Sequence, residues 1–190
     1  MLKHKEKFSL TMCRLLTVLF LAVTAVAASA QRVGIKTNAL YWATATANLG
    51  LEFRLNRHLT LNLEGGYHKL YFVNRIDTRA EFADAEMRYW FSARPQAGHF
   101  VGLMGVGGNY DLTLSHKCHV GDAIGFGPTY GYSFVLGRHW SLETTVGVGA
   151  VYQREKHYDE SFEPVPETPN RRKWIFSPIK AGVTFVYIIR

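Results

Sequence analysis

The stretch WSLETTVGVGAVYQ, residues Trp140 to Gln153, decides the fold class. Every second side chain from Trp140 to Tyr152 is apolar or aromatic, apart from one threonine, whereas the side chains between them are mostly small or polar. Alternation with a period of two is typical of a β-strand with two unlike faces, because successive side chains point to opposite sides of the chain. The stretch therefore predicts a strand, and the question is which face meets water.

The same alternation recurs along the chain and predicts eight strands joined by links of alternating length. The strands are expected within Val33–Trp42, Ala47–Leu55, Leu59–Tyr71, Ala85–Phe91, His99–Tyr110, Ala123–Leu136, Trp140–Gln153 and Gly182–Ile189. Links of two to seven residues, at 56–57, 92–98 and 137–138, alternate with longer links at 73–80, 111–120 and 154–173, and only the first link, near Thr44, breaks the scheme. Short turns at one end and long loops at the other are typical of bacterial outer-membrane barrels.

The sizes of the side chains on the two faces indicate that the apolar face is the outer one. An eight-stranded barrel has an interior barely wide enough for side chains, so the face rich in glycine, serine and threonine belongs inside and the bulky face outside. The sequence thus predicts an all-β, eight-stranded antiparallel up-and-down transmembrane β-barrel. A soluble, lipocalin-like ligand-binding barrel, with its apolar face turned inward, is the alternative.

The first 30 residues have the pattern of a cleavable signal peptide. Four basic residues precede a 13-residue apolar run, which is shorter than the roughly 20 residues of a membrane helix, and Ala28-Ser29-Ala30 follows. We expect export and an outer-membrane barrel domain of residues 31–190. Loss of four basic residues and one acidic residue lowers the formal charge from +7 to +4, which gives no support to nucleic-acid binding. Cys118 alone remains, so no intramolecular disulfide is expected.

The same assignment of faces places charged residues inside the barrel and aromatic residues at its two rims. The expected lumen charge network is Lys36, Glu52, Arg54, Glu64, Glu86, Arg88 and Glu143. Such charges must pair across neighbouring strands, because isolated buried charges are very unfavourable. We therefore expect a charged plug rather than an open pore. The expected aromatic girdles are Phe91, Phe100, Phe134 and Trp140 near the short turns, and Tyr41, Tyr71, Tyr110, Tyr152 and Trp174 near the long loops.

The long loops hold the remaining candidate sites. Arg171, Arg172 and Lys173 could bind a partner or the phosphates of lipopolysaccharide. His116, Cys118 and His119 are a weak metal candidate, because their spacing matches no zinc motif, so no metal and no cofactor is expected.

Five segments carry a family resemblance: KTNALYWATATANLGLEF, EMRYWF, GHFVGL, GYSFVLGRHWSLETTVGVGA and GVTFVYII. They resemble the Bacteroidota outer-membrane barrel family known as domain of unknown function 3575. The resemblance implies an outer-membrane location in a Gram-negative anaerobe and a link to fimbrial or surface-protein systems, and it supplies no catalytic residue.

The expected function is that of a non-enzymatic outer-membrane barrel with a structural or surface-interaction role. Its expected partners are outer-membrane lipid, lipopolysaccharide and a surface or fimbrial protein. The alternatives are a lipid-modifying enzyme, for which His68 and Ser133 would have to meet a carboxylate, and the soluble ligand-binding barrel.

Overall fold

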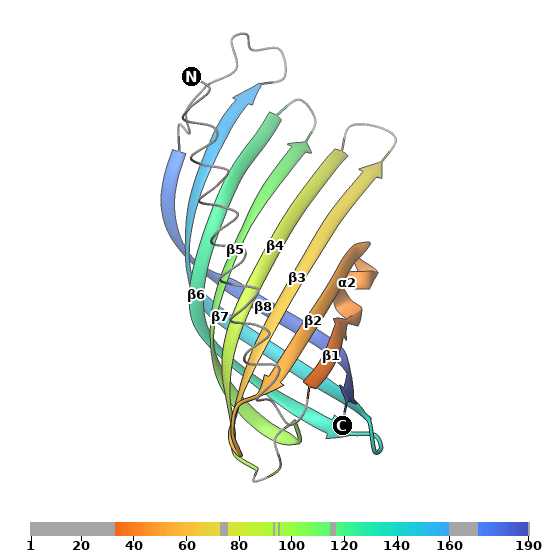
Figure 1. Cartoon of the computed structure of the whole chain (residues 1–190). Coiled ribbons are helices and arrows are strands. Elements are labelled where there is room, and N and C mark those ends of the chain that lie inside the picture. Colours follow the sequence, from red (N-terminus) through yellow and green to blue (C-terminus); the bar gives the residue numbers. More distant parts are fainter. Residues whose placement is uncertain are drawn as a thin grey trace, which may run out of the picture.

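The strands form one closed ring. The computed structural model describes residues 33–72, 76–92, 94, 96–114, 117–159 and 171–189, and the predicted signal peptide lies outside them. Eight antiparallel strands follow one another in sequence order, and the last pairs with the first to close a barrel (Figure 1), which confirms the predicted all-β, up-and-down order. The elements are β1 (Val33–Asn38), α2 (Ala39–Ala43), β2 (Thr46–Arg54), β3 (Leu59–Phe72), β4 (Ile76–Trp90), β5 (Gly98–Leu114), β6 (Lys117–Val135), β7 (Trp140–Asp159) and β8 (Arg171–Ile189).

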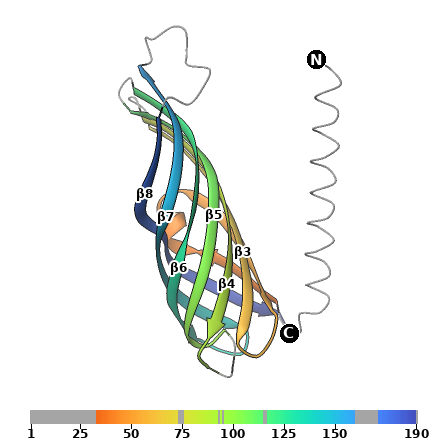
Figure 2. The ribbon, with the colours of Figure 1, turned by 90° about the vertical axis from the view of Figure 1, so that its left-hand side faces the viewer.

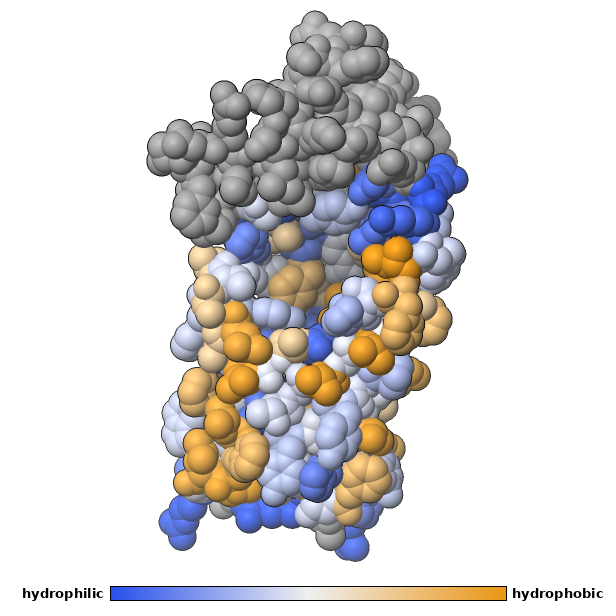
Figure 3. All heavy atoms as spheres, turned by 180° about the vertical axis from the view of Figure 1, so that it is seen from behind, coloured by the Kyte–Doolittle hydropathy of each residue, from blue (hydrophilic) through white to orange (hydrophobic). Residues whose placement is uncertain are grey.

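The faces of the strands are sorted as the alternation predicts. On β7, Val146 is 61% exposed and points outward, whereas Glu143 is 1% exposed and points inward. Among the described residues, 25 large apolar side chains are exposed and only five apolar side chains are buried, against 19 buried polar or charged ones. Figure 3 shows apolar side chains spread over the outer wall. A water-soluble protein has the opposite distribution, because it buries apolar side chains.

The strands extend farther than the alternation predicts. β5 and β6 stay paired to Leu114 and Lys117, inside the predicted loop at 111–120, and β7 and β8 take up much of the predicted loop at 154–173. The turned view shows these long strands running obliquely around the barrel (Figure 2). In the β7 extension, residues 154–159, nearly every position is polar or charged, so the sequence shows no alternation there although the backbone ladder continues.

The first predicted strand, Val33–Trp42, is wrong in its second half. β1 ends at Asn38, and α2 follows it. Asn38 is the N-cap of this helix, since its Oδ1 accepts a hydrogen bond from the backbone nitrogen of Leu40 at 3.1 Å. The same side chain also continues the sheet: its Nδ2 donates to the carbonyl oxygen of Ala181 at 3.1 Å, and its Oδ1 accepts from the nitrogen of Val183 at 3.1 Å.

The hairpin of β1, α2 and β2 is therefore short and leaves a gap in the wall. The side chain of Asn48 replaces the next backbone rung between β1 and β2, because it accepts from Asn38 N at 2.6 Å and donates to Asn38 O at 3.0 Å. Figure 1 shows β3 to β7 rising above this hairpin. Beyond it, no described strand pairs with residues 171–183 of β8 or 69–72 of β3 on this side.

Substitution of Asn38 by alanine tests its double role as cap and ladder rung. Asn38→Ala should lower the free energy of unfolding by about 2 kcal/mol, because one cap and two edge hydrogen bonds are lost at a buried position. Urea unfolding of the refolded barrel measures the change. Asn109→Ala, at an exposed position on β5, is the matched control and should change stability by no more than about 0.5 kcal/mol. Equal effects of the two substitutions would contradict the role of Asn38.

Candidate functional site

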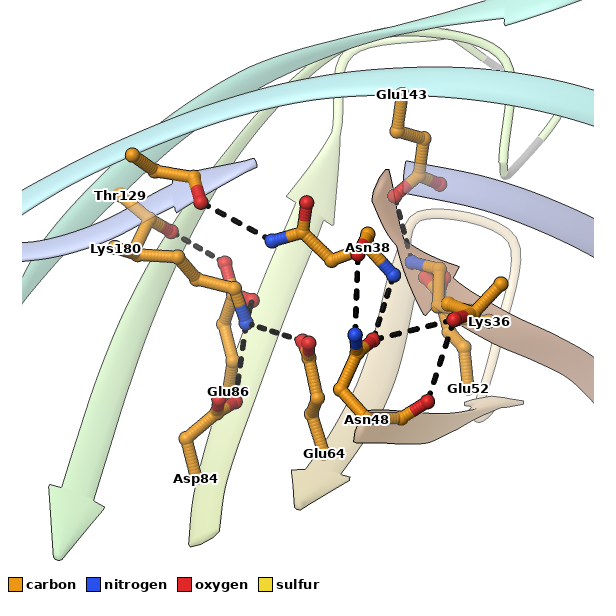
Figure 4. Close-up of polar contacts among 12 residues, drawn as sticks. Lys36, Asn38, Asn48, Glu52, Glu64, Asp84, Glu86, Thr129, Glu143 and Lys180 are labelled. Atoms are coloured by element: carbon orange, nitrogen blue, oxygen red, sulfur yellow. Dashed lines mark hydrogen bonds and ion pairs between the residues drawn. The ribbon is translucent and has the colours of Figure 1, made fainter. Parts of the chain in front are cut away.

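Eight charged side chains fill the lumen at and below the level of α2, and we call them the lumen ion cluster. They come from six strands, and each is at most 7% exposed. Figure 4 shows most of them converging from opposite walls. The cations are Lys36, Arg88 and Lys180, and the carboxylates are Glu52, Glu64, Asp84, Glu86 and Glu143.

Arg88 organises the half of the cluster nearer the short turns. Its Nη2 lies 2.7 Å from Glu86, and its Nη1 lies 3.0 Å from Glu143 and 3.5 Å from Glu52. Lys36 joins the same two acids from β1, with its Nζ 2.6 Å from Glu143 and in direct contact with Glu52. Guanidinium suits this position because its rigid fork of donors can serve several carboxylates at once.

Lys180 organises the other half. Its Nζ lies 3.0 Å from Glu64, 3.1 Å from Asp84 and 3.5 Å from Glu86 (Figure 4). Glu86 thus contacts both Arg88 and Lys180 and connects the two halves. It also accepts a hydrogen bond from the hydroxyl of Thr129 on β6.

Two aromatic rings and a loop residue close the lumen below the cluster. Trp90 and Phe100 are fully buried, with ring centroids 4.6 Å apart, and the guanidinium carbon of Arg88 lies 4.5 Å from the centroid of Phe100. The indole nitrogen of Trp90 donates to Thr60 at 2.9 Å. Gln96, from the link between β4 and β5, is only 3% exposed. The lumen is therefore packed with side chains at this end.

The cluster is stable only as a set. Each buried charge loses its hydration, and pairing with opposite charges and hydrogen-bond donors offsets that loss. With three cations against five carboxylates, each cation serves at least two acids. The arrangement acts as a fixed plug that links strands on opposite sides of the barrel.

The structure brings together six of the seven residues expected in the lumen network: Lys36, Glu52, Glu64, Glu86, Arg88 and Glu143. Arg54 was wrongly included. It lies at the end of β2, partly exposed, and its Nε donates to the carbonyl oxygen of Asn56 in the adjacent turn at 3.2 Å. A long side chain at the rim can reach water, which a residue farther inside cannot.

Two members of the cluster, Asp84 and Lys180, were missed. Each could have been found by extending the alternation of its own strand. Asp84 lies two residues before Glu86 on the same face, and Lys180 lies two and four residues before the inward-facing Gly182 and Thr184.

Three members of the predicted girdles face the lumen instead. Phe100 packs on Trp90, Tyr41 contacts the inward-facing Phe82 with ring centroids 5.2 Å apart, and the hydroxyl of Tyr110 donates to Glu155 at 3.3 Å. Phe100 and Tyr110 have the parity of the inner face of β5, which outweighs their aromatic character, whereas Tyr41 lies on α2 rather than on a strand. Phe91, Phe134, Trp140 and Trp174 are exposed on the outer face as predicted, Tyr152 contacts Trp174, and the side chain of Tyr71 lies outside the described residues.

The strands are longer than predicted, so described residues of the predicted loop sites lie in strands rather than in loops. Arg171, Arg172 and Lys173 begin β8 rather than end a loop; Arg172 and Lys173 are exposed, and the side chain of Arg171 is not described. Cys118 and His119 lie in β6, whereas His116 lies outside the described residues. Within the described residues, no three histidine, cysteine, aspartate or glutamate side chains are grouped to hold a metal ion.

The two residues considered for catalysis do not meet. His68 lies on β3 opposite Thr46, and its Nδ1 is 3.0 Å from the hydroxyl of that threonine. Ser133 lies on β6 opposite Glu143 near the short turns, and its hydroxyl donates to the carbonyl oxygen of Gln96 at 3.1 Å.

Comparison with known proteins identifies a family. Residues 15–189 match the family model described as Protein of unknown function (DUF3575). No curated protein and no solved structure matches the chain. None of the helices in the described part of the chain has the length and apolar character needed to cross a membrane.

Removal of Arg88 tests whether the cluster is a single unit. Arg88→Met should lower the free energy of unfolding by about 3–5 kcal/mol, because Glu52, Glu86 and Glu143 lose a shared buried cation. Urea unfolding measures the loss. The matched control is Arg79→Met, since Arg79 pairs with Glu81 on the exposed outer face at 2.9 Å and exposed pairs contribute about 0–1 kcal/mol. A loss below about 1 kcal/mol for Arg88→Met would show that the plug does not hold the barrel together.

Proposed function

The chain belongs to the family described as Protein of unknown function (DUF3575), and from its geometry we propose that it is a non-enzymatic outer-membrane β-barrel with a structural or surface-interaction role. The observation that carries the proposal is the reversed distribution of side chains, with an apolar outer face around a lumen of paired charges. Hydrocarbon is the surrounding that makes such a distribution favourable. Residues 1–30 would direct export as a signal peptide.

The dimensions of the outer face fit a bilayer. On β7, the outward-facing residues run from Trp140 to Tyr152, and they are apolar or aromatic apart from one threonine. At about 3.3 Å per residue and a tilt of about 40°, that length spans about 30 Å, which matches a hydrocarbon core. The closed ladder is also what a bilayer demands, because backbone polar groups find no water there.

The packed lumen supports a role other than that of a pore. Lys36, Arg88 and Lys180 are each held by buried carboxylates, and Gln96 and two aromatic rings close the lower end. What the fold offers instead is the wall of long strands beyond the apolar band. This wall would contact lipopolysaccharide or a surface or fimbrial protein, and the exposed Arg172 and Lys173 directly before Trp174 suit phosphate groups.

A lysine in the outer band separates membrane insertion from a soluble barrel. Leu103 on β5 is 65% exposed and lies between the two rims of the barrel. Leu103→Lys should therefore make the free energy of folding into lipid vesicles about 2–4 kcal/mol less favourable. The fraction of protein that shifts in mobility on a gel when boiled measures folding. Asn109→Lys adds the same charge on the outer face of β5 beyond the band and should fold normally. If Leu103→Lys instead yields a soluble, folded protein without detergent, the membrane proposal is wrong.

A further inference from the structure

Above the lumen ion cluster, part of the interior of the barrel is lined by apolar side chains. Phe82, Val106, Ala123 and Val151 face inward from β4, β5, β6 and β7, and with Tyr110 they line a cavity of about 200 Å³, which we call the upper chamber. All five side chains are half-buried rather than buried. Gly125 leaves little space between its neighbours on this wall, because a Cβ built on it would lie 3.0 Å from Val151 and 3.4 Å from Val106.

The size and lining of the upper chamber define the chemistry it accepts. The inward-facing side chains that line it carry no charge, so an ionic headgroup would lose hydration there without compensation. An apolar cavity of about 150 Å³ can hold benzene, so the upper chamber has room for several methylene groups but not for a large ligand. The end of an alkyl chain fits these limits. Among the inward-facing side chains of the lining, Tyr110 carries the polar group, and its hydroxyl donates to Glu155.

The short hairpin gives the upper chamber an entrance from the side. β1, α2 and β2 leave residues 171–183 of β8 and 69–72 of β3 without a described strand between them, opposite the wall formed by β4 to β7. Figure 3 shows the wall hollowed below the grey atoms when the molecule is seen from behind. The entrance is thus bounded below by α2.

The side chains of α2 connect the outer face to the chamber. Leu40 and Trp42 are 44% and 55% exposed, whereas Tyr41 between them turns inward and contacts Phe82, which lines the chamber. Tyr41 therefore joins the exposed apolar side chains of α2 to the lining of the upper chamber. A partner strand added to the free edge of β8 fits less well, because Pro178 lacks a backbone N–H and edge prolines oppose strand addition.

We propose that the upper chamber binds the end of one alkyl chain of a membrane amphiphile, which enters sideways over α2 while its headgroup stays outside. The inference rests on the proposed function, since Leu40 and Trp42 meet lipid only if the barrel is inserted. The chamber would give the protein a lipid-binding site that is separate from the lumen ion cluster.

Photolabelling in vesicles tests this binding. The probe is a long-chain fatty acid with a diazirine near its methyl end, mixed into vesicles that hold the folded, heat-modifiable protein. After illumination, mass spectrometry of peptides should find label on Val106, Ala123 or Val151 as well as on outer-face residues such as Val146. Val151→Phe should reduce the inner label about tenfold by filling the chamber. Label on the outer face should be unchanged and serves as an internal standard.

Two further variants keep the result interpretable. Val146→Phe places the same added volume on the outer face of the same strand and should leave the inner label intact, and Ala123→Leu should reduce it from a different wall. Outer label without inner label in the wild-type protein, or undiminished inner label in folded Val151→Phe and Ala123→Leu, would overturn the chamber as a binding site. Failure of the wild-type protein to insert would instead overturn the proposed function, and the gel shift separates the two outcomes.

Discussion

The rest of the structure depends on Arg88 and the three carboxylates around it. Eight strands enclose a space that only side chains can fill, and an apolar outer face leaves the polar side chains to fill it. Glu52, Glu86 and Glu143 arrive from three different strands, so a single guanidinium pulls β2, β4 and β7 toward one point. Closure of the barrel and pairing of the charges therefore depend on each other, because neither the acids nor Arg88 could be buried in an open sheet.

Sequence reasoning succeeded where the two faces of a strand meet different surroundings. There the alternation is strong, and it located all eight strands and six of the eight members of the lumen ion cluster. It failed where that contrast disappears. The upper part of β7, residues 154–159, is polar or charged at nearly every position, so the pattern does not record that the strand continues there. Asn38 ends β1 through side-chain hydrogen bonds that no periodicity records, and Phe100 and Tyr110 were assigned by residue type although their parity places them inside.

The register shift between β7 and β8 lets β8 direct a lysine into the lumen and a phenylalanine to the outer face. The shift lies at Gly147 and Val148, which pair with Lys180 and Pro178, so Ile179 is the extra residue. Below it, odd-numbered residues such as Phe185 face outward and Lys180 faces the cluster; above it, even-numbered residues such as Phe176 face outward. Without the shift, a regular strand would turn either the lysine to the apolar face or Phe176 to the lumen. One bulge thus keeps both in place.

The two ends of the barrel are built on different principles. At the short-turn end, the turns before β3 and β7 are equivalent: the Nδ1 atoms of His58 and His139 each lie 3.0 Å from a carbonyl oxygen of the next strand, at Trp90 and Ile188. Each imidazole also stacks on the tyrosine one residue before that carbonyl, with ring centroids 5.6 Å apart for Tyr89 and 5.7 Å apart for Tyr187. Such paired corners fix the strand ends rigidly.

The opposite end has no such equivalence. There β1, α2 and β2 stop short while β3 to β8 continue, so the wall is tall on one side and low on the other. Because the lumen ion cluster fills the interior at and below the level of α2, a shorter hairpin opens no path through the barrel; it opens only the apolar space above the plug. The plug therefore keeps the lumen closed although the wall is asymmetric, and leaves the upper end free to differ in shape.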